Sequence, residues 1–126
     1  YRVVKLILAP LDRQVLRERI ALRFAQMLER GLLEEVDALF RRGDLNPHMP
    51  SMRAVGYRQV WRYLAGKTEH AEMVREAVTA TRQLGKRQLT WLRGEADGTW
   101  LDSDAPDVIN RALKLLGTVP TMLSYR

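Results

Sequence analysis

The chain has 126 residues, a length that suits one domain with one hydrophobic core, and its 46% apolar and 29% charged residues favour a folded protein over a disordered one. It contains no cysteine, which excludes disulfides, thiolate metal sites and a cysteine nucleophile and fits a reducing cytosol. The net charge is +6, and no apolar run approaches the roughly 20 residues that a membrane-spanning helix needs.

The N-terminal segment predicts one short β-strand. Residues 3–8, Val-Val-Lys-Leu-Ile-Leu, are rich in β-branched and apolar side chains, and Pro10 follows them closely. A single strand is not stable alone. We therefore expect this strand either to pair with the segment at residues 100–101 or to join a sheet whose other strands lie outside this sequence.

Two helices and a loop are predicted next. Asp12 is a suitable N-cap for a helix that reaches about Arg30, and Gly31 is a suitable stop for it. A second helix is expected over residues 32–42, where apolar side chains again recur at helical spacing. Residues 44–51 contain two prolines and several turn-forming residues, which predicts a loop.

The remaining sequence predicts three more helices and one more short strand. Helices are expected over residues 57–64 and over residues 68–93, the longest in the chain, which Thr68 would begin. Residues 100–101 favour a strand, and a last helix is expected over residues 106–116 with a proline in its first turn. The predicted fold class is therefore mostly α with a minor β element, followed by a frayed tail at residues 118–126.

Positive charge is concentrated in one third of the sequence. Residues 53–93 contain nine Lys and Arg residues and three acidic residues, whereas the rest of the chain has 12 of each sign. Such a concentrated excess indicates a polyanionic partner. The alternative, which composition alone would favour, is a solvated basic surface without a partner.

The long helix over residues 68–93 has two faces. At 100° per residue, four basic side chains fall within about 40° of one line. These residues, called the basic stripe below, are Arg75, Arg82, Lys86 and Arg93. The opposite side carries Met73, Ala77, Ala80, Leu84 and Trp91. We expect this apolar side to pack against a core and the basic stripe to point away from it, where the stripe can follow a phosphate backbone. Trp61 and Trp100, which lie outside this helix, are also expected to be packed. The alternative is a solvated face with internal charge pairs.

A second basic cluster occupies residues 51–59. Gly56 lies at a loop-to-helix junction, where free backbone N–H groups can bind an anion. Arg53 and Arg58 flank it, and Tyr57 offers a ring on which an RNA base can stack. The alternative, favoured by pattern alone, is an ordinary helix start with Tyr57 packed.

Three motifs in order resemble the bacterial tRNA dimethylallyltransferases, which are also called tRNA isopentenyltransferases. The first is Leu-Arg-Glu-Arg-Ile-Ala-Leu-Arg-Phe-Ala-Gln-Met-Leu at residues 16–28, followed by Gly-Leu. The second is Arg-Ala-Val-Gly-Tyr-Arg-Gln at residues 53–59, and the third is Thr-Arg-Gln-Leu-Gly-Lys-Arg-Gln-Leu-Thr-Trp-Leu-Arg at residues 81–93. The resemblance covers about residues 5–117. Each motif alone is weak, but the three together are specific.

The resemblance implies a reaction and a set of site residues. Enzymes of this family transfer a dimethylallyl group from dimethylallyl diphosphate to N6 of the adenosine immediately 3′ of the anticodon, and the tRNA anticodon stem-loop is the partner. Arg23 is implied to reach toward the allyl diphosphate or the reacting centre; its alternative role is an internal pair with Glu18 or Asp37. The residues implied to bind tRNA are Arg53, Ala54, Val55, Gly56, Tyr57, Arg58, Arg82, Lys86, Arg87, Gln88, Leu89, Thr90, Trp91, Leu92 and Arg93.

Several parts of that family have no counterpart in this sequence. It contains no phosphate-binding loop of the G-x-x-x-x-G-K-[ST] type, no general-base Asp from that half of the enzyme, and no inserted helical domain. We therefore expect the C-terminal part of a longer P-loop-type α/β enzyme, with Tyr1 not a natural start and with no catalytic residue or metal ligand of its own. The resemblance implies Mg²⁺ as cofactor, bound mainly by the missing half, and we expect this part alone to be inactive.

The expected organisation is a single C-terminal helical region of a cytoplasmic, monomeric enzyme that does not contact a membrane. Its expected segments are a core-sheet strand at 1–10, helices at 11–43, a loop at 44–52, tRNA-binding helices at 53–95, a terminal strand and helix at 96–117 and a tail at 118–126. Two alternatives remain open. One is an adenylate isopentenyltransferase that uses a free nucleotide; the other is a non-catalytic basic helical module that binds nucleic acid or a partner protein.

Overall fold

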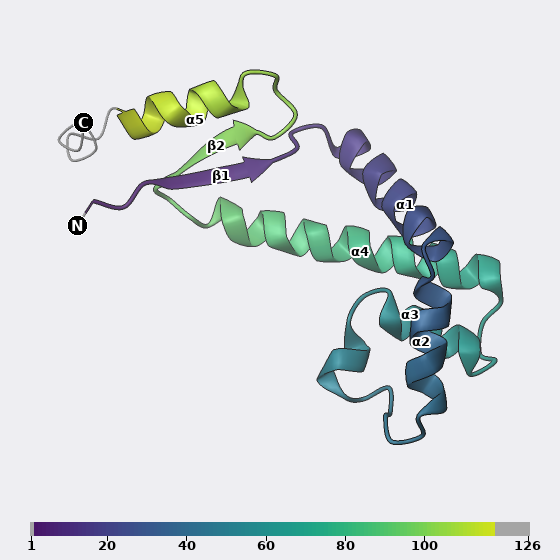
Figure 1. Ribbon diagram of the computed structural model, residues 1–126. Coiled ribbons are helices and arrows are strands. Elements are labelled where there is room, and N and C mark those ends of the chain that lie inside the picture. The colour runs from purple at the N-terminus through teal and green to yellow at the C-terminus, as the bar shows by residue number, and fades with distance from the viewer. Residues whose placement is uncertain (1, 118–126) are drawn as a thin grey trace. The chain divides into compact units, whose positions relative to one another are not determined.

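The computed structural model describes residues 2–117 (Figure 1). These residues belong to two compact units. The first joins the N-terminal residues up to Leu16 to the residues from Gln88 onward, and the second comprises residues 17–87. Within the described residues the strands form one two-stranded sheet and most other residues are helical. The predicted fold class, mostly α with a minor β element, is confirmed at this level.

A pair of parallel strands forms the centre of the first unit. Strand β1 (Lys5–Ala9) pairs with β2 (Gly98–Asp102), and Ile7 lies opposite Trp100 in the register. Ile7 and Leu101 are buried. A Cβ atom at Gly98 would collide with the Ile7 side chain, so glycine permits this close pairing. The N-terminal strand therefore adopts the first of its two predicted alternatives, pairing with the segment around residue 100.

Helix α5 (Val108–Gly117) follows β2 and contacts it. It begins two residues after Pro106, and the backbone N–H of Val108 donates to the carbonyl of Ala105 at 3.2 Å. Ile109 is 72% exposed, and none of the residues of this helix is buried. The predicted tail at residues 118–126 lies outside the described residues.

The second unit has a helical core. Its elements lie in the order α1 (Arg13–Glu29, of which the first four residues belong to the first unit), α2 (Leu32–Arg41), the 3₁₀ helix η1 (Pro50–Arg53), α3 (Tyr57–Leu64) and α4 (His70–Arg93, of which the last six belong to the first unit). Its buried cluster consists of Phe24, Leu32, Val36, Met52, Val60, Trp61, Met73 and Ala77. Each of α1, α2, η1, α3 and α4 contributes to this cluster, which is why the short helices are held in place.

Local capping signals explain the two ends of α1. The Asp12 carboxylate accepts a hydrogen bond from the backbone N–H of Gln14 at 2.9 Å, which confirms Asp12 as the N-cap. Gly31 adopts a φ of +103°, a left-handed conformation that suits glycine and separates α1 from α2. Both features were predicted from sequence.

Several predicted boundaries differ from the structure: the first strand is Lys5–Ala9 rather than 3–8, the second is Gly98–Asp102 rather than 100–101, and the last helix is Val108–Gly117 rather than 106–116. The predicted loop over residues 44–51 ends in η1, which buries the Met52 side chain in the core cluster. The long helix begins at His70 rather than at Thr68: its first helical hydrogen bond runs from the N–H of Met73 to the carbonyl of Glu69 at 2.9 Å, and the buried Thr68 hydroxyl finds no hydrogen-bond partner within residues 2–117.

Candidate nucleic-acid interface

Helix α4 carries the basic stripe. All four side chains, Arg75, Arg82, Lys86 and Arg93, are exposed. Within residues 2–117 no carboxylate lies within 4.0 Å of the charged groups of Arg75, Arg82 or Arg93. Glu76 on the same helix is bound by Arg62 at 3.1 Å. The alternative of internal charge pairs therefore does not hold for these three arginines.

The opposite face of α4 is buried only in its N-terminal half. Met73 and Ala77 are fully buried in the core cluster, whereas Leu84 is 36% exposed and Trp91 is 69% exposed. The prediction that Leu84 and Trp91 face a core is therefore wrong. The reason is that the α4 residues of the core cluster end at Ala77, although the helix continues for four more turns to Arg93.

The other two tryptophans are less exposed than Trp91. Trp61 is buried and packs edge-on against Phe40, with ring centroids 4.8 Å apart, so its predicted packing role is confirmed. Trp100 on β2 is half-buried and lines the pocket described below.

The turn before α3 is closed by its own hydrogen bonds. Gly56 has a φ of +96° and is buried, and its backbone N–H donates to the Oε1 atom of Gln59 at 2.8 Å. The carbonyl of Gly56 accepts from the N–H of Val60 at 3.0 Å. The prediction that the Gly56 N–H is free to bind an anion is therefore wrong: Gln59, three residues into the helix, reaches back and occupies it.

Tyr57 links this turn to helix α2. Its hydroxyl donates a hydrogen bond to the Oε1 atom of Glu35, 22 residues earlier in the chain. This hydrogen bond, together with partial burial, raises the pKa of the Tyr57 hydroxyl above its usual value. The Tyr57 ring packs against the core cluster, so the alternative of a packed Tyr57 holds for the ring. Arg53 and Arg58 on either side are exposed and, within the described part of the chain, have no carboxylate within 4.0 Å.

Arg23 lies on α1, exposed, next to the buried Phe24. It makes no ion pair with any described residue, and Asp37, one of its two candidate partners, binds Arg41 at 2.9 Å. The guanidinium of Arg23 is thus available to an external anion. The remaining residues implied to bind tRNA are exposed or half-buried: Ala54, Arg87, Gln88 and Thr90 are exposed, and Val55, Leu89 and Leu92 are half-buried.

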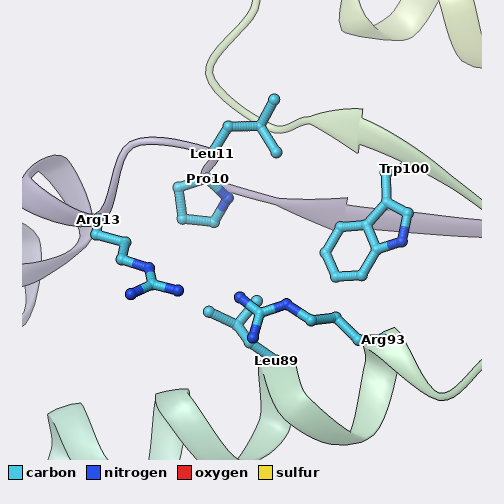
Figure 2. Close-up of a pocket in the computed structure, with 6 residues that line it drawn as sticks. All are labelled: Pro10, Leu11, Arg13, Leu89, Arg93 and Trp100. Carbon is cyan, nitrogen blue, oxygen red and sulfur yellow. The ribbon is translucent and has the colours of Figure 1, made fainter.

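A pocket in the first unit brings together residues that the sequence did not group (Figure 2). It has a volume of about 190 Å³, and its lining residues are Pro10, Leu11, Arg13, Leu89, Arg93 and Trp100. Figure 2 shows the guanidinium groups of Arg13 and Arg93 pointing toward each other across this space. Sequence reasoning assigned Leu89 and Arg93 to RNA binding but missed Arg13. Its position just after a strand of a parallel sheet was an available signal, because ligands commonly bind beyond the carboxyl ends of such strands.

The described residues offer neither a metal site nor a membrane span. No three His, Asp or Glu side chains in residues 2–117 are grouped so that they could hold a metal ion. In the same range, no helix combines the length and the apolar character that crossing a membrane requires.

Exposed arginines without acidic partners within residues 2–117 form a surface of the kind that suits a phosphate-rich ligand. Residues 1–95 match the family of IPP transferases, and the chain belongs to this family. The full-length tRNA isopentenylpyrophosphate transferase from Bacillus halodurans is similar to it over 100% of this chain and 43% of that protein, with 31% sequence identity and a TM-score of 0.85.

A second solved structure is also similar to this chain. The tRNA delta(2)-isopentenylpyrophosphate transferase from Staphylococcus epidermidis is similar over 95% of this chain and 38% of its own, with 25% identity and a TM-score of 0.76. The chain thus spans about two fifths of the length of these two structures.

Proposed function

We propose that this chain is the tRNA-binding C-terminal part of a tRNA dimethylallyltransferase. The single observation that carries the proposal is the row of exposed arginines on α4 that no acid of the described chain neutralises, in a member of the IPP transferase family. The two solved relatives are named as tRNA isopentenylpyrophosphate transferases, which supports tRNA as the substrate.

In the proposed reaction, N6 of the adenosine 3′ of the anticodon attacks the allylic carbon of dimethylallyl diphosphate. The new N–C bond forms as the C–O bond to the diphosphate breaks, and the diphosphate leaves with the bonding electron pair. The proton of N6 passes to a general base outside this chain. This chain contributes arginines that hold phosphate: Arg82 and Arg93 for RNA, and Arg23 for the allyl diphosphate.

The dimensions of the basic stripe favour RNA over a free nucleotide. Arg75 and Lys86, which both belong to the second unit, are 11 residues apart on α4, and this corresponds to about 17 Å along the helix axis. A polynucleotide presents a phosphate every few ångströms along such a distance, whereas a mononucleotide occupies one end of it. The adenylate-modifying alternative is therefore disfavoured.

The active-site parts that this sequence lacks would come from the remaining polypeptide of the enzyme. We propose that the phosphate-binding loop, the general-base Asp and the Mg²⁺ ligands belong to it; in support, this sequence contains no G-x-x-x-x-G-K-[ST] motif, and residues 2–117 contain no cluster of three His, Asp or Glu side chains that could hold a metal ion. The Mg²⁺ would neutralise charge on the leaving diphosphate. We further propose a monomeric, cytoplasmic enzyme in which this chain alone is inactive.

Steady-state kinetics of the intact transferase test the assignment of α4. Arg82→Glu reverses one charge of the basic stripe, so KM for tRNA should rise at least tenfold while KM for dimethylallyl diphosphate stays within about twofold. Arg30→Glu, an equal charge reversal at an exposed residue outside α4, serves as the control and should change neither KM by more than about twofold. Equal increases of both KM values in Arg82→Glu would contradict the assignment.

A further inference from the structure

Arg13 and Arg93 converge on one pocket although they are 80 positions apart in the sequence. Arg13 opens α1 and Arg93 closes α4, and both residues belong to the first unit. Their guanidinium groups point toward the same space (Figure 2). Neither group has a carboxylate within 4.0 Å in the described range, residues 2–117. The pocket thus holds two positive charges with no internal counter-charge.

Two like charges that share a pocket repel each other, and the repulsion is stronger beside protein than in bulk water. An anion placed between them removes that repulsion and gains charge-assisted hydrogen bonds at the same time. Guanidinium groups bind phosphate oxygens in pairs through their planar N–H forks, which makes phosphate the anion that this arrangement suits best.

The rest of the pocket is apolar. Pro10, Leu11 and Leu89 line it, and Trp100 adds a half-buried indole ring (Figure 2). Its volume of about 190 Å³ is smaller than the roughly 300–1,000 Å³ of pockets that enclose a whole small molecule. The pocket can therefore enclose a phosphate and a small apolar or planar group attached to it, and the rest of a larger ligand would extend outside it.

We propose that Arg13 and Arg93 form a binding site for a phosphate ester, with the apolar wall receiving the group that the phosphate carries. The proposal rests on the proposed function, which supplies two sources of such a group: a backbone phosphate of the RNA and the diphosphate of the allyl donor. Arg13 gains a role in this site that none of the three sequence motifs gave it.

Binding titrations with the intact transferase test the site. Wild type, Arg13→Ala, Arg93→Ala, the double variant and the control Arg30→Ala are titrated with an anticodon stem-loop RNA and, separately, with dimethylallyl diphosphate. Each single pocket variant should weaken the binding of one of these ligands about tenfold or more, since a hydrogen-bonded charge pair is lost, and Arg30→Ala should change it less than twofold. The ligand that responds identifies the source of the phosphate.

The double variant distinguishes a shared phosphate from general attraction. If both arginines hold one phosphate, the double variant should lose much less than the product of the two single losses. Losses that multiply, or an Arg13→Lys variant that binds as tightly as wild type, would overturn the proposal, because charge alone would then explain the effect. All of these substitutions are at exposed residues, and circular dichroism checks that each variant remains folded.

The binding measurements can contradict the pocket proposal and the proposed function independently. If Arg82→Glu weakens RNA binding while Arg13→Ala and Arg93→Ala change the affinity for neither ligand, the pocket proposal fails and the proposed function stands. If wild type does not bind the stem-loop but the pocket variants weaken diphosphate binding, the proposed RNA-binding function fails and the phosphate site stands.

Discussion

The hydroxyl of Tyr57 connects two helices through its hydrogen bond to Glu35. Tyr57 opens α3 and Glu35 lies on α2, so the bond fixes the turn that carries Arg53 and Arg58 relative to the rest of the second unit. Its position at the surface limits its contribution to stability, because solvent screens a partly exposed charged hydrogen bond. We regard Glu35 as a positioning residue for this turn.

The pKa of Tyr57 predicts how stability depends on pH. Because the folded state raises this pKa, the contribution of the bond is fully present below the unfolded pKa near 10 and is lost as pH rises through the folded value. We expect the free energy of unfolding of wild type to fall more steeply above about pH 10 than that of Tyr57→Phe. Urea unfolding from pH 7 to pH 11 measures this. Parallel curves for the two proteins would contradict the role of the hydroxyl.

Gln59 is a buried polar residue with one clear task, accepting the hydrogen bond of the Gly56 N–H. Gln59→Ala would leave that buried donor unsatisfied, so we expect it to lower the free energy of unfolding by about 1–3 kcal/mol. The neighbouring Arg58→Ala changes an exposed side chain and should stay within about 0.5 kcal/mol of wild type. Denaturant unfolding of the two variants compares them. A Gln59→Ala protein as stable as Arg58→Ala would show that the turn does not need this acceptor.

At the scale of elements, local signals predicted most of the secondary structure. Asp12 capped α1, Gly31 ended it, and residues 57–64 formed a helix with the predicted bounds. These features depend on residues within one turn of each other, which is why one sequence suffices to find them. The Gln59 side chain was a comparable local signal, since a Gln three residues into a helix often caps the preceding N–H.

Contacts between elements were harder to predict from the sequence. The pattern of α4 gave the direction in which Trp91 points but not whether another element covers it, and the described chain leaves it largely exposed. The hydrogen bond of Tyr57 to Glu35 and the pocket that Arg13 and Arg93 both line involve residues far apart in sequence. Periodicity within one element carries no information about such encounters.

The two halves of α4 should respond differently to truncation. Met73 is fully buried, so Met73→Ala should lower the free energy of unfolding by about 2–5 kcal/mol, the range for large-to-small changes in a core. Trp91→Ala removes a larger side chain that is 69% exposed, and we expect a loss below about 1 kcal/mol. Denaturant unfolding of both variants measures the contrast. A larger loss for Trp91→Ala than for Met73→Ala would contradict the burial of α4 described here.

At the scale of the whole molecule, the chain presents charged and apolar surfaces that residues 2–117 do not cover. Strand β1 pairs with β2, yet Leu8 is 59% exposed, although parallel sheets are normally covered on both faces. The chain spans 43% and 38% of the two solved transferases that it resembles. On the proposed function, this chain is a surface for RNA and phosphate within a larger catalytic unit.

The salt dependence of RNA binding tests the central claim, that arginines of the basic stripe contact RNA phosphates. The affinity of the intact transferase for an anticodon stem-loop is measured from about 50 to 200 mM salt, and the logarithm of the association constant is plotted against the logarithm of the salt concentration. Each phosphate contact contributes a slope of about −0.7 to −0.9, so Arg82→Gln should make the slope shallower by about that amount, whereas Arg30→Gln should leave it unchanged. A wild-type affinity that does not vary with salt, or an Arg82→Gln slope equal to that of wild type, would contradict the claim.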